Sequence, residues 1–278
     1  MKIAKTVASA RAFCQKAARP VVLVPTMGAL HHGHGALIKK ARRLAGKDGA
    51  VAVSIFVNPT QFGPREDFSK YPRRWENDLA VCRSGGVDLL FAPAVGEMYA
   101  KDHSVFVDES SLSQHLCGAA RPGHFRGVCS VVARLFLILQ PDLAVFGEKD
   151  WQQLAIIRRM VRDLTFPVRI VGHPTIREAD GLAVSSRNAY LLPAERQAAP
   201  GIHDALRRAA RGATRAAILK EGRRLIGKIP GARLDYLELV EAETLEPAKN
   251  RVRPMRLAVA VFLGATRLID NIAVSTRS

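Results

Sequence analysis

Short runs of β-branched residues alternate with longer helical patterns through the first two-thirds of this 278-residue chain. The runs occupy residues 21–25, 50–57, 87–91, 143–146 and 167–171, and apolar residues recur at helical spacing over 36–45, 74–84, 128–139 and 151–163. Apolar strands that alternate with helices are typical of a parallel sheet covered by helices on both faces. The sequence therefore predicts an α/β, Rossmann-like fold.

The pattern changes after Asn188. Helical spacing over 194–211 and 214–226 precedes two strand-like runs at 234–241 and 256–263. This order is typical of a small α+β domain. We therefore expect a first domain over 1–187 and a smaller C-terminal domain over 188–278.

The composition is that of a globular chain, with 48% hydrophobic residues. No uninterrupted apolar run approaches the roughly 18 residues that a membrane-spanning helix needs, and the N-terminus lacks the apolar run of a secretory signal. We expect a cytoplasmic protein without a membrane partner. The four cysteines are too widely spaced for a zinc site or a redox pair, and we expect them to be reduced and partly buried: Cys14, Cys82, Cys117 and Cys129.

The formal charge of +17 raises the possibility of a nucleic-acid partner. The basic residues are spread in pairs such as Arg42-Arg43 and Arg158-Arg159, and only 6% of residues are aromatic, which argues against a surface for stacked bases. This distribution favours solvated helix faces, so we expect no nucleic acid. A basic nucleic-acid-binding module is the more distant alternative, and salt-sensitive retention on duplex DNA would reveal it.

The stretch VVLVPTMGALHHGHGALIKKARR, residues 21–43, predicts a strand over 21–24, a loop over 27–33 and a helix over 35–43. Ligands of open parallel sheets bind at the carboxyl ends of the strands, where helix N-termini attract anions. Gly28 and Gly33 would let the backbone approach a phosphate, and His31 and His34 can donate hydrogen bonds to it. The alternatives are a glycine-rich turn with incidental histidines, or zinc, for which the metalloprotease spacing and glutamate are absent.

Two further stretches follow predicted strands. The Asn58 and Gln61 amides suit a hydroxyl and a carboxylate, although Asn-Pro-Thr is also a plain turn signal. In Gly147-Glu148-Lys149-Asp150, Lys149 can reach phosphates and Asp150 can cap the next helix, although an ordinary helix start has the same pattern. Gln153 lies one helical turn beyond Asp150 and can face the same cleft.

Ser185-Ser186-Arg187 combines two hydroxyl groups with a permanent cation, a set suited to triphosphate oxygens. The alternative is a solvated interdomain loop. Asp78 is read from the sequence as an exposed acid on a helix.

Five motifs in order resemble one family over nearly the whole chain. They are PTMGALHHGH at 25–34, SIFVNPTQFG at 54–63, RPGHFRGV at 121–128, FGEKDWQQL at 146–154 and READGLAVSSRN at 177–188. The chain thus resembles the pantothenate synthetase (pantoate–β-alanine ligase) family of the HxGH nucleotidyltransferase superfamily.

The resemblance implies ATP-dependent condensation of (R)-pantoate with β-alanine to pantothenate, AMP and diphosphate, through a pantoyl-adenylate intermediate. It implies Mg²⁺ and a homodimer. Residues 1–187 would then be the catalytic domain that binds ATP and pantoate, and 188–278 a lid. A sister nucleotidyltransferase is the nearer alternative; it would make a stable nucleotide product and ignore β-alanine. The neutral amides of Gln61 and Gln153 favour pantoate over the second phosphate-bearing substrate of such an enzyme.

The resemblance also assigns roles to residues. His34, His31 and Lys149 would be catalytic, and Asp78 would lie near the metal. Pantoate and β-alanine would be bound by Met27, Asn58, Gln61 and Gln153. ATP would be bound by Met27, Gly28, His31, Gly33, His34, Gly147, Glu148, Lys149, Asp150, Ile176, Val184, Ser185, Ser186 and Arg187.

Three positions depart from the family pattern. Gly35 replaces a larger apolar residue and would loosen the helix start, because glycine costs roughly 0.5–1 kcal/mol relative to alanine within a helix. Val184 replaces methionine and would alter packing near the adenine. Asn77 stands where some relatives carry an acid, which weakens the metal assignment.

Overall fold

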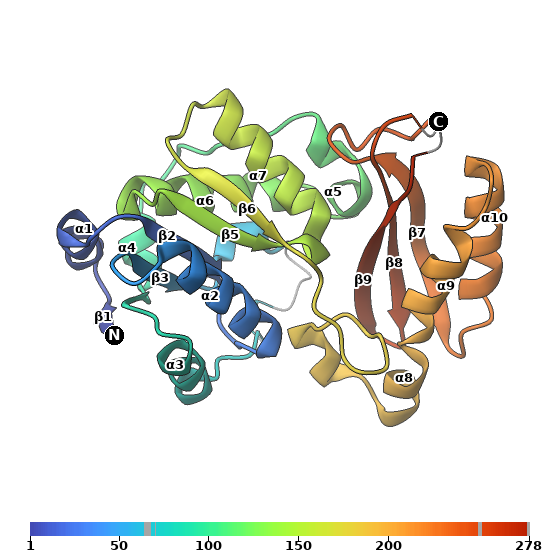
Figure 1. Ribbon diagram of the computed structural model, residues 1–278, viewed down its shortest axis with the longest axis horizontal. Helices are drawn as coiled ribbons and strands as arrows, with labels where there is room; N and C mark the ends of the chain where they lie inside the picture. Colours follow the sequence, from blue (N-terminus) through green and yellow to red (C-terminus); the bar gives the residue numbers. More distant parts are fainter. Residues whose placement is uncertain (64–67, 70, 250–251, 277–278) are drawn as a thin grey trace. The chain divides into compact units, whose positions relative to one another are not determined.

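Six parallel strands form the larger sheet of the computed structural model, which describes residues 1–63, 68–69, 71–249 and 252–276 (Figure 1). The strand order is β1-β4-β3-β2-β5-β6, and every neighbouring pair is parallel. In that order the strands are Lys2–Ala4, Leu89–Phe91, Ala50–Ile55, Val21–Thr26, Leu143–Gly147 and Arg169–His173. The predicted α/β class is confirmed, and the carboxyl ends of the strands meet at one edge.

Helices cover both faces of this sheet. They are α1 (Val7–Lys16), α2 (His32–Ala45), α3 (Trp75–Ser84), α4 (Val95–Met98), α6 (His124–Leu139) and α7 (Trp151–Asp163). Val22 and Val24 of β2 pack in one core with Ile38 of α2. Val21 and Leu23 point the other way and are equally buried, and α6 contacts β2 without joining that core. Burial on both faces explains why the run at 21–24 is apolar throughout rather than alternating.

A second, antiparallel sheet has the order β7-β8-β9. Its strands are Ala232–Glu241, Met255–Leu263 and Thr266–Val274. The helices α9 (Gly201–Ala209) and α10 (Arg215–Ile226) share a hydrophobic core with this sheet, in which Leu206, Ile218 and Leu257 are buried. Two further short α-helices are α5 (Leu116–Ala120) and α8 (Pro193–Ala198). The expected C-terminal α+β region is confirmed.

Several boundaries differ from the sequence prediction. The helix predicted over 194–211 is two helices, α8 and α9, because Pro200 between them has no N–H to continue the first. The strands β1 and β9 and the helix α1 were not predicted. The helix α2 begins at His32, so the loop predicted to run to Gly33 is shorter and His34 lies in the first helical turn.

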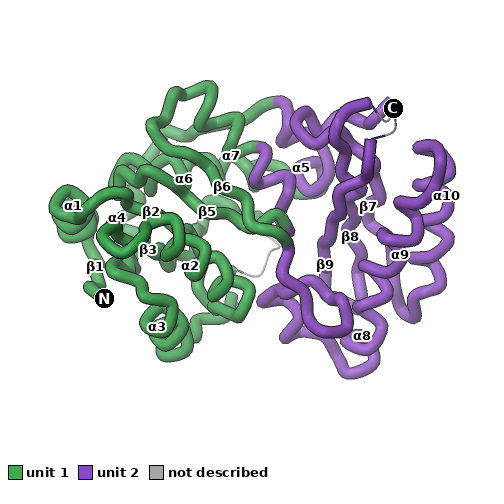
Figure 2. Tube along the Cα trace, viewed as in Figure 1, with its two compact units in different colours: residues 1–110, 121–148, 156–174 green, residues 111–120, 149–155, 175–278 purple. Residues whose placement is uncertain are grey.

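The chain divides into two compact units that interleave along the sequence (Figure 2). Unit 1 comprises Met1–Ser110, Arg121–Glu148 and Ile156–Pro174, and unit 2 comprises Ser111–Ala120, Lys149–Ala155 and Thr175–Ser278. This division differs from the predicted boundary after residue 187. Trp151 donates from Nε1 to the Ala242 carbonyl at 2.9 Å, and Gln152 accepts from the Cys117 N–H at 2.9 Å, so short segments that precede residue 187 belong to unit 2.

Within the described part of the chain, no helix combines the length and apolar character needed to cross a bilayer. All four cysteines are buried, and none of them forms a disulfide bond.

Candidate active site

The loop after β2 has a backbone that few residues adopt. Gly28 and Ala29 have φ of +85° and +51°. A Cβ on residue 28 would lie 3.0 Å from both Asp78 Oδ2 and Ile55 Cγ2, so glycine is needed there for conformation and for space. The Gly28 N–H donates to Thr26 Oγ1 at 3.1 Å, which anchors the start of the loop to the strand.

The helix α3 holds the rest of this loop. The Asp78 carboxylate accepts from the Ala29 N–H at 3.0 Å and from the Leu30 N–H at 2.6 Å, and the Asn77 amide donates to the Leu30 carbonyl at 2.8 Å. Asp78 is 2% exposed, so the expectation of an exposed acid is wrong. Burial raises the pKa of Asp78 above its ordinary value, although the bonds from Leu30 and Ala29 act in the opposite direction. An ionised acid in place of Asn77 could not donate in this way.

His31 and His34 lie together where the loop becomes α2. Their ring centroids are 4.1 Å apart, and the His31 N–H donates to His34 Nδ1 at 3.3 Å. Because Nδ1 accepts, the neutral His34 ring carries its proton on Nε2. In the first turn the His34 N–H is taken by the His31 side chain in a capping box, whereas the Gly33 N–H is not used by the hydrogen bonds within the helix. This helix start therefore presents an imidazole donor beside main-chain donors, an arrangement that suits an anion.

A buried network fixes Gln61 at the end of β3. Asn58 donates from Nδ2 to Gln61 Oε1 at 3.1 Å, and Gln61 Nε2 contacts Met27 Sδ at 3.1 Å. Asn58 Oδ1 accepts from the Thr60 hydroxyl at 2.9 Å and from the Tyr99 hydroxyl at 2.8 Å. Asn58 is 1% exposed and its second N–H is bonded to a main-chain carbonyl. The Asn58 amide thus makes hydrogen bonds within the protein that orient Gln61, and its expected contact with a substrate stays a prediction.

The RPGHFRGV motif, which spans the start of α6, contacts the same residue. His124 Nδ1 lies 2.9 Å from the Gln61 carbonyl, and Arg121 donates to the same carbonyl at 3.4 Å and to His124 Nε2 at 3.0 Å. A Cβ on Gly127 would lie 2.4 Å from the Thr60 carbonyl oxygen. The absence of a side chain at Gly127 therefore lets α6 approach the Asn58-to-Gln61 turn.

The FGEKDWQQL motif begins at the carboxyl end of β5. Gly147 is the last residue of that strand, and Glu148, Lys149 and Asp150 form a 3₁₀ turn that continues directly into α7. Asp150 lies inside this turn, so its expected role as a helix cap is not confirmed. Lys149 and Gln153 belong to unit 2, and their side chains are partly exposed.

The serine-arginine segment follows a short hairpin of unit 2. The Val184 N–H donates to the Ile176 carbonyl at 3.0 Å, and Val184 is 5% exposed. Ser185 Oγ accepts from the Arg187 N–H at 3.3 Å, which caps the 3₁₀ helix Ser186–Tyr190. The three residues are partly exposed, so the hydroxyls and the guanidinium remain accessible to a ligand.

The predicted residues therefore fall into one group in each unit. Unit 1 gathers a set at the carboxyl ends of β2, β3 and β5: Met27, Gly28, His31, Gly33, His34, Asn58, Gln61, Gly147 and Glu148. Unit 2 holds Lys149, Asp150, Gln153, Ile176, Val184, Ser185, Ser186 and Arg187. Sequence reasoning missed Tyr99, for which no local signal exists. It also missed the roles of His124 and Gly127, although the RPGHFRGV motif contains both.

A protein-held metal ion finds little support in this arrangement. Among residues 1–63, 68–69, 71–249 and 252–276, no group of three or more His, Cys, Asp or Glu side chains is placed to hold one. Both oxygens of Asp78 already accept main-chain N–H groups. The predicted metal role of Asp78 does not fit its surroundings.

Comparison with protein families and curated proteins agrees with the motifs. The family model described as Pantoate-beta-alanine ligase matches residues 2–273. The pantothenate synthetase of Akkermansia muciniphila is 54% identical, with 91% of each chain covered, and that of Moorella thermoacetica is 47% identical, with 99% of each covered.

The solved structures that resemble this chain include members of the same family. The pantothenate synthetase of Thermus thermophilus has a TM-score of 0.93 and 49% identity, with 99% of this chain and 100% of that chain covered. The pantoate-beta-alanine ligase of Francisella tularensis, complexed with beta-gamma ATP and beta-alanine, has a TM-score of 0.81 and 32% identity, with 98% and 97% covered.

Proposed function

The chain belongs to the pantoate-beta-alanine ligase family, and from that premise we propose how its own residues catalyse the ligation. The enzyme is a ligase that makes pantothenate from pantoate and β-alanine. A carboxylate does not form an amide with an amine at neutral pH unless it is first activated. The Francisella relative was solved with beta-gamma ATP and β-alanine. We take ATP as the activating substrate here.

The proposed reaction has two steps. A carboxylate oxygen of (R)-pantoate attacks the α-phosphorus of ATP, the α–β phosphoanhydride bond breaks, and pyrophosphate leaves. The β-alanine amine then attacks the acyl carbon of the pantoyl adenylate, the acyl–phosphate bond breaks, and AMP leaves while the nitrogen loses a proton. The first step concentrates negative charge on phosphate oxygens, so preorganised donors and cations dominate its catalysis.

His34 is the principal donor in this proposal. Its Nδ1 accepts the His31 N–H, so the neutral ring donates through Nε2. The start of α2 adds the positive end of the helix and main-chain N–H groups, with Gly33 allowing close approach and Gly28 shaping the loop before it. His31 assists from the adjacent ring. The contact between the His31 N–H and His34 Nδ1 at the beginning of α2 is the observation that supports this mechanism.

Four further residues neutralise the remaining phosphate charge in this proposal. Lys149 supplies an ammonium group, Arg187 a guanidinium group, and Ser185 and Ser186 two hydroxyl donors. The other predicted ATP-binding residues contribute main-chain or packing contacts: Gly147, Glu148, Asp150, Ile176 and Val184.

Gln61 binds pantoate in this scheme, with its amide orientation set by Asn58. Met27 touches the Gln61 amide and packs against the dimethyl group of pantoate. Gln153 supplies a second neutral amide for the hydroxyls, and Gln61 also meets β-alanine. Neutral amides suit these polar but uncharged groups better than cations do.

Mg²⁺ enters this scheme as part of the ATP substrate. The described residues do not fit a protein-held ion, because no suitable ligand cluster exists among them and Asp78 is committed to the loop. Magnesium usually keeps its waters and needs few protein ligands when it rides on a nucleotide. No step here passes through a protein-bound metal. A cytoplasmic location, a homodimer and a lid role for residues 188–278 stay predictions.

The test is AMP release by the purified full-length chain with Mg-ATP and pantoate, with and without β-alanine. Steady AMP release that requires both pantoate and β-alanine is the expected result. A stable nucleotide product formed without regard to β-alanine would instead indicate a sister nucleotidyltransferase.

A further inference from the structure

Two polar side chains in the middle of β9 have no part in the mechanism above. Asp270 is 6% exposed and its neighbour Asn271 is 4% exposed. Consecutive strand residues project from opposite faces, and Leu268 and Val274, on the same face as Asp270, belong to the hydrophobic core. A buried polar group is costly unless it is paired, so the partners of these two residues indicate what they do.

Asp270 binds Arg177 with both carboxylate oxygens. Oδ2 lies 2.7 Å from Nη1 and Oδ1 lies 2.9 Å from Nη2, and the His203 Nδ1 lies 3.6 Å from Oδ2. Burial alone would raise the pKa of Asp270, but the contacts with His203 and Arg177 hold that pKa below its ordinary value. A buried ion pair stabilises a fold little compared with apolar side chains of the same volume. Stability alone therefore does not account for the pair.

Arg177 begins the hairpin that leads to the Ser185–Arg187 segment. It pairs with Ala183 across an antiparallel bridge, and its Nη1 also donates to the Gly181 carbonyl at 3.2 Å. Beyond the serines, Asn188 returns to the same hairpin and donates to the Ala183 carbonyl at 3.1 Å. The contact with Asp270 thus ties the base of the hairpin, and the segment that follows it, to β9.

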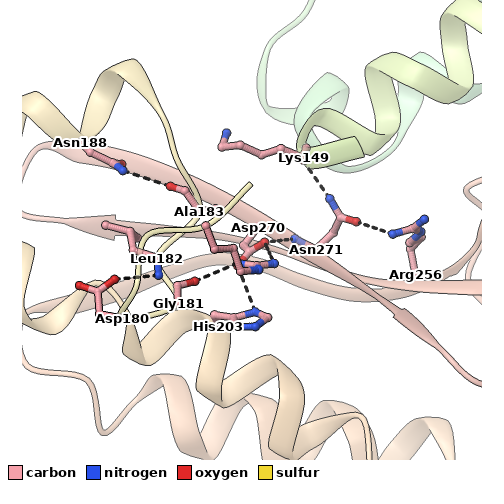
Figure 3. Close-up of polar contacts among 11 residues, drawn as sticks. Lys149, Asp180, Gly181, Leu182, Ala183, Asn188, His203, Arg256, Asp270 and Asn271 are labelled. Carbon is pink, nitrogen blue, oxygen red and sulfur yellow. Dashed lines mark hydrogen bonds and ion pairs between the residues drawn. The ribbon is translucent and has the colours of Figure 1, made fainter. Parts of the chain in front are cut away.

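Asn271 holds the other phosphate-binding segment of unit 2. Its Nδ2 donates to the Lys149 carbonyl at 2.9 Å, and its Oδ1 accepts from Arg256 Nη1 at 3.3 Å. The Arg256 guanidinium lies 3.5 Å from the centre of the Trp151 ring, which fixes the donor in turn. The amide can satisfy both partners in one orientation only, because a carbonyl accepts and a guanidinium donates. The Lys149 side chain leads away from this contact (Figure 3), so its ammonium group remains for the substrate.

We propose that Asp270 and Asn271 are positioning residues for adenylate formation. Asp270 fixes the position of the Ser185–Arg187 segment through Arg177, and Asn271 fixes the position of the main chain at Lys149. One strand thereby fixes two phosphate-binding segments that are distant from it in sequence. This inference rests on the proposed roles of Lys149 and the Ser185–Arg187 segment, and a misplacement of about 1 Å at such groups can cost on the order of 10²-fold in rate.

The test uses two isosteric variants, Asp270→Asn and Asn271→Asp. The first cannot accept both arms of Arg177, and the second cannot donate to the Lys149 carbonyl. Each is expected to slow single-turnover adenylate formation by on the order of 10- to 100-fold. Aminolysis of chemically prepared pantoyl adenylate by β-alanine should keep its wild-type rate, because pyrophosphate has already left. General damage to the fold would lower both rates, so this split distinguishes positioning from a structural role.

Further variants complete the test. Asp235→Asn is the matched control, because Asp235 pairs with Arg267 at 2.8 Å in the same sheet rather than with either phosphate-binding segment; both half-reactions should be unchanged. Arg177→Met combined with Asp270→Asn should be no slower than Arg177→Met alone, since Arg177→Met already removes the contact through which Asp270 acts. If Asp270→Asn does not fold, Arg177→Lys replaces it. That variant keeps the charge but loses the two-pronged contact, so adenylate formation should slow while aminolysis is spared.

Lys149→Ala, measured in parallel, separates the possible failures. If Lys149→Ala slows adenylate formation while the folded Asp270 and Asn271 variants do not, the inference is overturned and the proposed function stands. Equal slowing of adenylate formation and aminolysis also overturns it. If Lys149→Ala itself has no effect, the proposed role of Lys149 fails, and that of Asn271 fails with it.

Discussion

His34 illustrates how one main-chain contact can set the chemistry of a side chain. The His31 N–H occupies Nδ1, so the proton that His34 can offer to a phosphate is on Nε2. Removing this donor with His34→Ala should slow adenylate formation by on the order of 10²–10³, as for a lost preorganised donor. A single-turnover assay with Mg-ATP and pantoate measures this rate directly.

The control for that experiment is His32→Ala, since His32 is an exposed neighbour with no role in the proposed mechanism. It should retain the wild-type rate. An unchanged rate in His34→Ala would remove His34 from the mechanism.

Asp78 acts through the loop rather than on the substrate. In Asp78→Asn, one of the two main-chain N–H groups of Ala29 and Leu30 would face an amide N–H instead of an oxygen. Leaving a buried donor unpaired costs about 1–3 kcal/mol, so the free energy of unfolding should fall by that amount. Urea denaturation measures this decrease. The control is Glu76→Gln, an exposed substitution on the same helix, which should leave the free energy of unfolding unchanged. Equal stability of both variants would contradict the assigned role of Asp78.

At the scale of elements, Gly127 sets how closely α6 approaches the turn that carries Gln61. In Gly127→Ala the new Cβ would meet main-chain atoms of Thr60 and Gln61 at 2.4–2.7 Å, so the helix or the turn must move. Overpacking of this kind costs about 1–3 kcal/mol of stability. The KM for pantoate should rise by on the order of tenfold, equivalent to about 1.4 kcal/mol of binding. Steady-state kinetics with pantoate varied is the measurement, and an unchanged KM would argue against Gln61 as the pantoate ligand.

Gly35 is the opposite case. A Cβ there meets nothing within 4 Å, and the residue lies in the first half of α2 with ordinary helical backbone. Gly35→Ala should therefore stabilise the protein by about 0.5–1 kcal/mol, because alanine loses less backbone freedom on folding. Thermal or urea denaturation tests this expectation. A decrease in stability would mean that the glycine serves the helix start in a way its surroundings do not reveal.

At the scale of the whole molecule, the buried thiols report on the integrity of the fold. Burial raises the pKa of Cys14 to about 11 and those of Cys82 and Cys129 to about 12. Since the thiolate is the reactive form, a disulfide reagent at pH 8 should label these three residues only slowly in the native protein and rapidly in guanidinium. Mass spectrometry of the labelled peptides measures this, and fast native labelling of any of the three would contradict their burial.

The same shifts give stability a pH dependence. A thiol whose pKa is raised by folding binds its proton more tightly in the native state. These groups therefore stabilise the fold fully below the unfolded pKa of about 8.5, and the contribution is lost progressively as the pH rises above it. Urea denaturation between about pH 7 and pH 10 should show this decline.

How much the sequence could predict differs between the parts of the molecule. The parallel sheet was readable because strands buried on both faces, such as Val21–Thr26, are continuous apolar runs. The strand β9 was not readable, because Arg267, Asp270 and Asn271 interrupt its apolar pattern and are accommodated only by partners elsewhere in the chain. Pro200 is a local signal for a helix break, but the helical periodicity on both sides of it led to the prediction of one continuous helix.

The sequence by itself determined the α/β class and the family, and it singled out the residues proposed to carry the chemistry, because all of these depend on local periodicity and on motifs whose members lie within a few positions of each other. Only the tertiary structure decided what supports those residues. The supporting contacts join residues that are 41 to 122 positions apart. They are the bonds of Asp78 to the loop after β2, the contact of Tyr99 with Asn58, and the contacts of β9 with Lys149 and Arg177. A pattern of neighbours contains no information about such pairs, since they are selected by the packing of elements that the chain brings together only when it folds.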